Sequence, residues 1–213
     1  MTTDQPNAID RVSWSRPDAE RPGTLLVVAL HGRGSDESSM IGLTQYLPAN
    51  VTVAAPRGPV DLGGGSTWFE NRGIGRPIEA SIKSTADAVF AWLDEVATPH
   101  SGVVILGFSG GTAMAGGLIL AQPARFAGAV LISGTLPWDA GFDTRPDRLA
   151  GLPLFWSMDV HDGVIPRDLV ERSESWLRSE SGAALEEHDY PDIGHSLSIE
   201  QLGDVSTFIT SLD

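Results

Sequence analysis

Hydrophobic runs alternate with amphipathic stretches along most of this chain. Continuous apolar runs, as expected of strands buried on both faces, occupy residues 24–30, 51–55, 103–108, 129–133 and 154–158. A more polar run at 185–190 predicts a strand near a sheet edge. The N-terminal segment 11–15 is a candidate antiparallel edge strand.

Helical patterns fall between these runs. Helices are predicted at residues 38–46, 78–96, 109–121, 166–179 and 198–212. The longest of them places Ile82, Val89 and Leu93 on one apolar face. Regular alternation of strands and helices predicts an α/β fold with a mostly parallel central sheet and helices on both faces.

Two stretches fit neither pattern. Residues 57–76 and 134–151 are long segments that follow predicted strands, and both contain bulky aromatic side chains. Long loops in a compact domain are often functional. Because open α/β sheets bind ligands at the carboxyl ends of their strands, we expect both loops to border a site.

Length and composition predict one globular domain over residues 1–213, which begins with a polar segment at 1–20. That segment lacks the apolar core of a signal peptide. No apolar run approaches the length of a membrane span. We therefore expect a cytoplasmic protein without membrane insertion.

Charge and residue usage exclude several functions. The net charge of −14 disfavours nucleic acid and anionic membranes as partners. The absence of cysteine excludes disulfides, thiolate metal sites and a cysteine nucleophile. No His, Asp or Glu cluster has metal-ligand spacing, and no phosphate-binding glycine motif follows a strand. We therefore expect neither a metal nor a cofactor.

The sequence Gly-Phe-Ser-Gly-Gly at residues 107–111 matches the pattern G-x-S-x-G. It lies between a predicted strand and a predicted helix, the setting in which a serine is held on a sharp turn with its hydroxyl exposed. Flanking glycines leave room where strand and helix nearly touch. With 24 glycines in 213 residues the pattern is weak alone, so Ser109 needs support from elsewhere in the chain.

The first support is His-Gly-Arg-Gly at residues 31–34, directly after the first long strand. A tetrahedral intermediate of acyl transfer needs two hydrogen-bond donors for its oxyanion. The loop after this strand and the residue after the nucleophile supply them in such sites. We expect the backbone N–H groups of Arg33 and Gly110.

The second observation that supports Ser109 as a nucleophile is a candidate acid and a candidate base that follow it in the chain. A serine needs a neutral imidazole to take its proton, and that imidazole needs a carboxylate to fix its tautomer. Asp162 and His195 each follow a predicted strand, and the chain order is Ser109, Asp162, His195. All three should therefore converge on one sheet edge.

Other residues compete for these roles. Asp159 is a real rival of Asp162, and Asp192 is a weaker one. The other histidines fit worse than His195. His31 is expected to brace the oxyanion loop, and His100 is expected to be solvated. His161 adjoins Asp162 but precedes the last strand, and His188 lies in that strand, where a half-buried histidine is expected.

Substrate contacts are less defined. Trp68 and Phe69 are predicted to line the acyl pocket, because their loop leads to the catalytic edge. Met158 is a further candidate for the pocket. For Trp138 and Phe142 the sequence leaves open both a place in the core and a place at the site. The Arg33 guanidinium could also bind an acidic substrate group, although its backbone role needs no particular side chain.

Together these motifs resemble the phospholipase/carboxylesterase family of α/β-hydrolases, which includes acyl-protein thioesterases. The matching segments are residues 30–34, 55–56, 68–69, 107–111, 131–134, 136–137, 162–166 and 194–195. The resemblance implies an α/β-hydrolase fold without a large cap domain. It also implies a serine esterase with the triad Ser109, Asp162 and His195 and with Arg33 and Gly110 as oxyanion donors.

The chain departs from the family pattern at two places. Met158 and Asp159 stand where a His-Gly pair is common, and Gly110 stands where a longer side chain is common. We predict a serine carboxylesterase acting on a small-molecule ester with a small or extended acyl group. A thioesterase or lysophospholipase, or a non-catalytic binding protein, is the alternative. A homodimer is left open.

Overall fold

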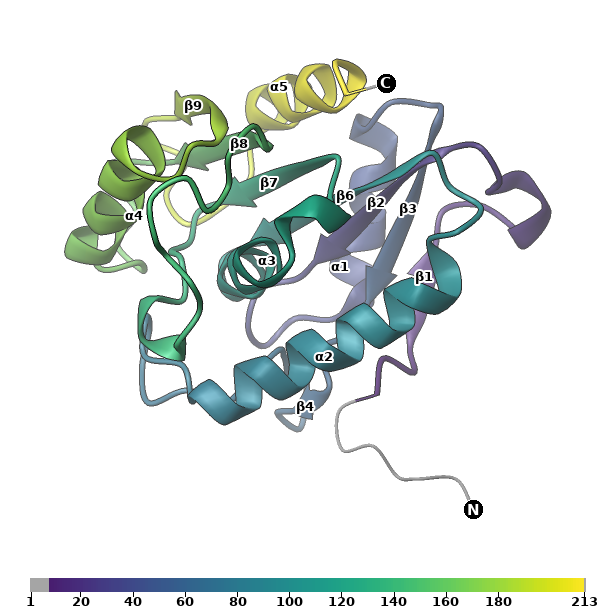
Figure 1. The fold of residues 1–213 in the computed structure, drawn as a ribbon. Coiled ribbons are helices and arrows are strands. Elements are labelled where there is room, and N and C mark those ends of the chain that lie inside the picture. The colour runs from purple at the N-terminus through teal and green to yellow at the C-terminus, as the bar shows by residue number, and fades with distance from the viewer. Residues whose placement is uncertain (1–7, 213) are drawn as a thin grey trace.

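The computed structural model describes residues 8–212, so the first seven residues of the polar segment lie outside it. A seven-stranded sheet runs through the centre of the molecule in the order β1-β3-β2-β6-β7-β8-β9 (Figure 1). Its strands are β1 (Val12–Trp14), β2 (Leu25–Leu30), β3 (Val51–Pro56), β6 (Gly102–Phe108), β7 (Gly128–Ile132), β8 (Pro153–Met158) and β9 (Ala184–Asp189).

All neighbouring strands are parallel except β1, which pairs antiparallel with β3 at one edge. The polar strand β9 forms the opposite edge, and most of its residues are partly or fully exposed. Both edge positions were predicted from the hydrophobic pattern. The strands β2, β6, β8 and β9 are therefore parallel, and their carboxyl ends point in the same direction. The predicted site residues lie in the loops that leave these ends.

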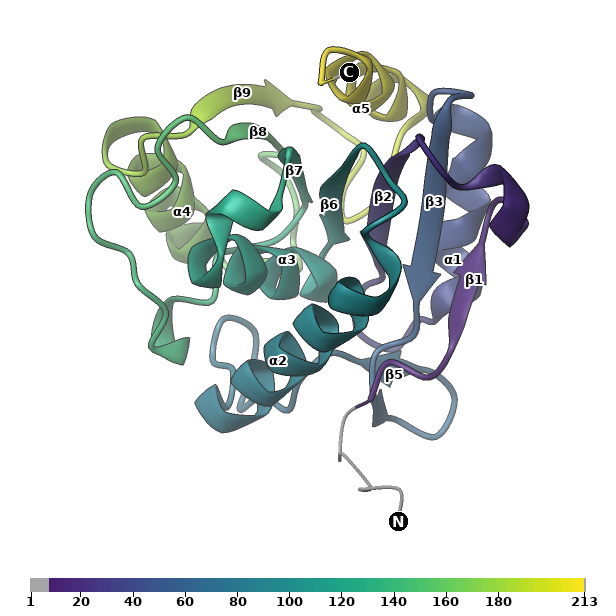
Figure 2. The same cartoon turned by 45° about the vertical axis from the view of Figure 1, so that its right-hand side comes forward.

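Helices cover both faces of the sheet. Those on one face are α2 (Glu79–Val96), α3 (Gly110–Ala121) and α4 (Arg167–Ser179), and those on the other are α1 (Glu37–Ile41) and α5 (Ile199–Thr210). Figure 2 shows the sheet between these two layers. The predicted mostly parallel sheet with helices on both faces is confirmed.

The two hydrophobic cores explain why the strands are apolar throughout. Leu26, Val28 and Leu30 of β2 pack into the core under α2 and α3. The alternate residues, among them Val27 and Ala29, pack into the core under α1 and α5. Since successive side chains of a strand point to opposite faces, a strand between two helix layers must be apolar at every position.

The predicted elements agree with the structure to within about two residues, apart from the stretch predicted as a helix over 38–46. Those residues form the short helix α1 followed by a 3-10 helix, Gly42–Tyr46. In the loop 57–76, strands β4 (Val60–Asp61) and β5 (Ser66–Thr67) form a small antiparallel ribbon that the pattern did not reveal. Two-residue strands are too short to produce a hydrophobic period.

Within residues 8–212, no helix is both long and apolar enough to cross a membrane.

Candidate active site

Ser109 occupies the sharp turn between β6 and α3. Its backbone has φ 56° and ψ −116°, a conformation that residues other than glycine rarely adopt. The Ser109 amide donates to the carbonyl of Ile132 in the neighbouring strand β7, at 3.0 Å. This hydrogen bond fixes the turn to the sheet. An unfavourable backbone conformation such as that of Ser109 persists only where the surrounding structure holds it in place.

The flanking glycines are required by space. A Cβ atom at Gly107 would lie 2.3 Å from the carbonyl oxygen of Gly111, and one at Gly111 would lie 2.1 Å from the carbonyl oxygen of Leu30. Both distances are far inside van der Waals contact with backbone atoms, which cannot swing away. The N-terminus of α3 therefore packs against β6 and β2 so closely that only glycine fits.

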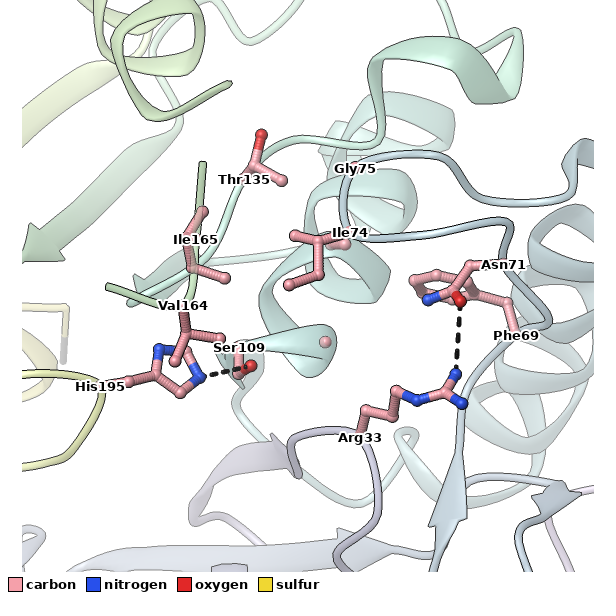
Figure 3. Close-up of a pocket in the computed structure, with 12 residues that line it drawn as sticks. Arg33, Phe69, Asn71, Ile74, Gly75, Ser109, Thr135, Val164, Ile165 and His195 are labelled. Atoms are coloured by element: carbon pink, nitrogen blue, oxygen red, sulfur yellow. Dashed lines mark hydrogen bonds between the residues drawn. The ribbon is translucent and has the colours of Figure 1, made fainter. Parts of the chain in front are cut away.

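Three predicted residues form one hydrogen-bonded chain. His195 Nε2 lies 2.8 Å from Ser109 Oγ, and the dashed line in Figure 3 marks this hydrogen bond. His195 Nδ1 lies 2.7 Å from Asp162 Oδ2. A carboxylate can only accept, so His195 Nδ1 carries the proton and donates it. In neutral His195 the Nε2 atom is then free to accept from the Ser109 hydroxyl.

The surroundings of Asp162 hold its carboxylate in place. Its Oδ1 atom accepts from the amides of Val164 at 2.8 Å and Ile165 at 3.2 Å, which leaves Oδ2 for His195. The Asp162 side chain is only 2% exposed, whereas the His195 side chain is 19% exposed. The ring of Phe108, at 5.2 Å between centroids, packs against the His195 ring.

Asp159 has a different set of partners. Its Oδ1 atom accepts from the His161 amide at 2.7 Å, and its Oδ2 atom accepts from the Gly194 amide at 2.5 Å. Burial opposes ionisation of this carboxyl, but the backbone donors prevail and its pKa is lowered from the ordinary value. Asp159 thus joins the loop that carries Asp162 to the loop that carries His195, whereas the imidazole of His195 pairs with Asp162.

The other aspartate and histidine candidates lie away from Ser109. Asp192 is exposed and pairs with exposed His161, at 3.5 Å. His188 of β9 stacks on Phe155 of the neighbouring strand β8, with 4.8 Å between ring centroids. His100, expected to be solvated, is instead half-buried, with its Nδ1 atom 3.1 Å from Thr24 Oγ1.

The backbone nitrogen of Arg33 lies close to Gly110, the residue after the nucleophile. The Arg33 nitrogen is 3.2 Å from the position that a Cβ atom of Gly110 would take. Gly110 is the first residue of α3, where an amide has no intrahelical acceptor. In the described part of the chain no acceptor is found for the Arg33 amide either. This arrangement can offer two N–H groups to an oxyanion.

Buried His31 braces the loop that carries Arg33. Its Nε2 atom accepts from the Gly58 amide at 3.0 Å, so its Nδ1 atom carries the proton and donates to the Gly32 carbonyl at 2.8 Å. Burial lowers the pKa of His31, which keeps the ring neutral. The Trp68 indole N–H donates to the His31 carbonyl at 2.8 Å and adds a second support.

A cavity of about 290 Å³ opens above Ser109 (Figure 3). Its wall is mostly apolar, and its polar side chains are few. The lining residues outside the hydrogen-bonded chain are Arg33, Phe69, Asn71, Ile74, Gly75, Gly110, Ala113, Thr135, Val164 and Ile165. A mostly apolar cavity with a few convergent polar groups is typical of a small-molecule site.

Of the residues predicted to contact substrate, Phe69 lines this cavity and two others do not. Trp68 is fully buried beneath the Arg33 loop. Met158 is 2% exposed and packs in the core, beside a separate surface hollow lined by Arg167 and Glu187. The prediction for Met158 is corrected: it is the last residue of β8, and its side chain points toward the α4 side instead of toward Ser109.

The loop residues Trp138 and Phe142 also belong to the packing around the core. Trp138 Nε1 donates to Ser173 Oγ at 3.1 Å, and Phe142 packs over Gly117 of α3. Neither is among the residues that line the cavity above Ser109. The loop 134–151 contributes Thr135 to that cavity.

Most of the cavity wall comes from residues whose direction the sequence does not indicate. Asn71, Ile74 and Gly75 come from the long loop that the pattern marked as functional without resolving which residues point inward. Val164 and Ile165 lie just after Asp162, so the motif that located the acid contained them. A hydrophobic residue in an irregular loop has no period from which its direction can be read.

Between residues 8 and 212, no group of three or more His, Asp or Glu side chains is placed to hold a metal ion.

The fold and the serine turn define the class of protein. A mostly parallel sheet between two helix layers, with a serine on a strained turn between a strand and a helix, is the α/β-hydrolase fold. The carboxylesterase of Bacillus cereus has this fold: its structure superposes with a TM-score of 0.80, covers 95% of this chain and 94% of its own, and is 21% identical.

Sequence comparison narrows the class to a family. The phospholipase/carboxylesterase family model matches residues 17–212, and the chain belongs to this family. A probable carboxylesterase of Oryza sativa subsp. japonica is 29% identical over 202 residues, covering 86% of this chain and 76% of that protein. Acyl-protein thioesterase 1 of Candida albicans is 25% identical over 210 residues, covering 87% and 91%. The predicted family is confirmed.

Proposed function

We propose that this member of the family is a serine carboxylesterase, with Ser109 as nucleophile, His195 as general base and Asp162 as the carboxylate that orients His195. The observation that supports it most is the hydrogen-bonded chain from Ser109 Oγ through His195 to Asp162, with links of 2.8 and 2.7 Å. Residues from three loops meet there with the geometry that nucleophilic catalysis needs.

In this mechanism Ser109 Oγ attacks the ester carbonyl while His195 Nε2 takes the hydroxyl proton. The amides of Arg33 and Gly110 stabilise the oxyanion that forms. His195 then returns the proton to the leaving alcohol, and an acyl group remains on Ser109. Water, deprotonated by His195, hydrolyses this acyl-enzyme and restores the serine.

The cavity supports small-molecule esters as substrates. Its volume of about 290 Å³ and its wall of Phe69, Ile74 and Ile165 suit a short or extended aliphatic acyl group. The absence of a bulky side chain at Gly110 leaves more room beside the nucleophile than the longer side chain common at this place in the family would allow.

Two measurements on purified protein test this function. Wild type should hydrolyse p-nitrophenyl butyrate and should be labelled by a fluorophosphonate probe at Ser109. Ser109→Ala should lose the label and lower kcat by about 10⁶-fold, as in other Ser-His-Asp enzymes. Exposed Ser101 gives a control variant, Ser101→Ala, that should keep both properties. Unchanged turnover in Ser109→Ala would exclude Ser109 as the nucleophile. A folded wild type that neither hydrolyses the ester nor reacts with the probe would favour a binding protein.

A thioesterase is the second candidate, because a 25% identical relative is an acyl-protein thioesterase. The same residues would act, with a thiol as the leaving group in place of an alcohol. Comparing kcat/KM for oxygen and thiol esters of the same acyl group separates the two. A thioester preference well above the difference in intrinsic reactivity of the two esters would assign the thioesterase.

A homodimer and a cytoplasmic location stay predictions of the sequence.

A further inference from the structure

Arg33 places its guanidinium at the edge of the cavity above Ser109. Its side chain is one of the lining groups, and its Nη1 atom donates to Asn71 Oδ1 at 3.3 Å. A guanidinium has five N–H donors, so most of its hydrogen-bonding capacity is unused in this contact. The amide N–H groups of Asn71 add donors at the same place.

The nearest acidic residues along the chain are occupied elsewhere. Asp36 and Glu37 follow Arg33 by three and four residues, but both pair with Arg57, at 3.6 and 3.3 Å. Arg11 also pairs with Glu37. In the described part of the chain no carboxylate lies within ion-pair distance of Arg33, although the protein carries a net charge of −14.

Among residues 8–212, no acidic side chain lines the cavity. The twelve lining residues include Arg33 as the cation and no aspartate or glutamate. Asp162 is covered by His195 and is 2% exposed. An anion that enters the cavity therefore meets a positive side chain without a competing carboxylate beside it, which favours its binding against the negative charge of the whole protein.

The position of Arg33 relative to His195 indicates which part of an ester substrate, the alcohol or the acyl group, lies near the guanidinium. His195 must lie within hydrogen-bond distance of the leaving oxygen to return its proton, so the alcohol lies on the His195 side of the carbonyl. Figure 3 shows Arg33 and Asn71 across the cavity from His195 and Val164, with Ser109 between them. The acyl group, which extends away from the leaving oxygen, is therefore the part that reaches Arg33.

We propose that the substrates are esters whose acyl group ends in a carboxylate, that is, half-esters of short dicarboxylic acids, and that the Arg33 guanidinium, held by Asn71, binds that carboxylate. Ile74 and Phe69 pack against the methylene groups between the two carboxyl groups. Arginine suits this role, because its planar fork matches a carboxylate in a bidentate contact. This inference rests on the proposed esterase function and specifies its substrate class.

The test compares charged and neutral substrates of the same shape. Monoethyl esters of succinic, glutaric and adipic acid carry the carboxylate, and the corresponding ethyl esters with a terminal amide are neutral isosteres. Acid release is measured for each pair, and the ratio of their kcat/KM values is taken. For at least one chain length wild type should favour the carboxylate by about tenfold or more, the size of one charge-assisted contact.

Three variants assign the preference to Arg33. Arg33→Gln keeps the backbone amide and removes the charge, so the ratio should fall to about one. Arg33→Lys should keep part of it. Arg72→Gln removes an arginine that follows Asn71 in the same loop but does not line the cavity, and should leave the ratio unchanged. Because both substrates are measured on each variant, any loss of folded protein cancels in the ratio.

The outcomes separate this inference from the proposed function. If wild type hydrolyses the neutral esters through Ser109 but shows no preference for the carboxylate at any chain length, the substrate class is wrong and the esterase stands. A preference that survives Arg33→Gln also overturns the role of Arg33. If no ester of either charge is hydrolysed by folded wild type, the proposed function fails and this inference fails with it.

Discussion

Two aspartates three residues apart have different tasks because different donors face them. The carboxylate of Asp162 meets the imidazole of His195, whereas that of Asp159 meets backbone amides of two loops. From the sequence alone both were candidates for the same role, since both follow β8. The direction of each side chain depends on the backbone conformation of the turn after β8.

Replacing Asp162 by asparagine should be far more damaging to turnover than replacing Asp159. Asp162→Asn keeps the shape but can hold His195 in the wrong tautomer, which lowers kcat about 10⁴-fold in other triads. Asp159→Asn should mainly lower the free energy of unfolding, by about 1–3 kcal/mol, because an amide cannot accept from both backbone donors. Ester turnover and thermal unfolding of both variants check this, and a larger kcat loss in Asp159→Asn would move the acid to that residue.

At the scale of elements, the contact between β6 and α3 sets the position of Ser109. The glycine pattern around the serine was legible in the sequence, since Gly107 and Gly111 bracket it. The structure adds the reason, which is backbone contact of α3 with β2 as well as with β6. The β4–β5 ribbon, by contrast, was not foreseen, because its pairing depends on contacts such as Ser35 with Ser66 that no local period encodes.

A Gly111→Ala variant should be destabilised, because its methyl group would lie 2.1 Å from the Leu30 carbonyl oxygen. We expect a loss of about 1–3 kcal/mol or more, together with reduced activity from a displaced Ser109. Gly203→Ala is the matched control. Gly203 is an exposed helical glycine of α5 with no atom within 4 Å of the added Cβ, and alanine there should stabilise by up to about 1 kcal/mol. Equal denaturation midpoints for the two variants would refute the steric argument.

At the scale of the whole molecule, burial makes stability depend on pH. Desolvation lowers the pKa of His31 from its ordinary value of 6.5, and the same cause lowers that of His100. The unfolded chain takes up these protons near pH 6.5, whereas the folded protein takes them up only at lower pH. The unfolded state therefore binds more protons, and stability falls as pH decreases below about 6.5.

Melting temperatures at pH 7.5 and 5.5 should show this loss in wild type. The difference between the two values should shrink in His31→Gln, which removes the buried imidazole. His161→Gln changes an exposed histidine and serves as the control. A pH dependence in His31→Gln as steep as that of wild type would exclude His31 as its source.

The sequence by itself determined the alternation of strands and helices, the serine turn and the order of Ser109, Asp162 and His195. These features are local: apolar periods, glycines at a close approach and side chains at strand ends leave a mark in neighbouring residues. Only the tertiary structure decided which loop side chains face the cavity. In the folded protein the side chains of Met158 and Trp68 are buried in the core, and those of Ile74 and Asn71 line the cavity. Those directions depend on contacts between residues far apart in the chain, which no local pattern records.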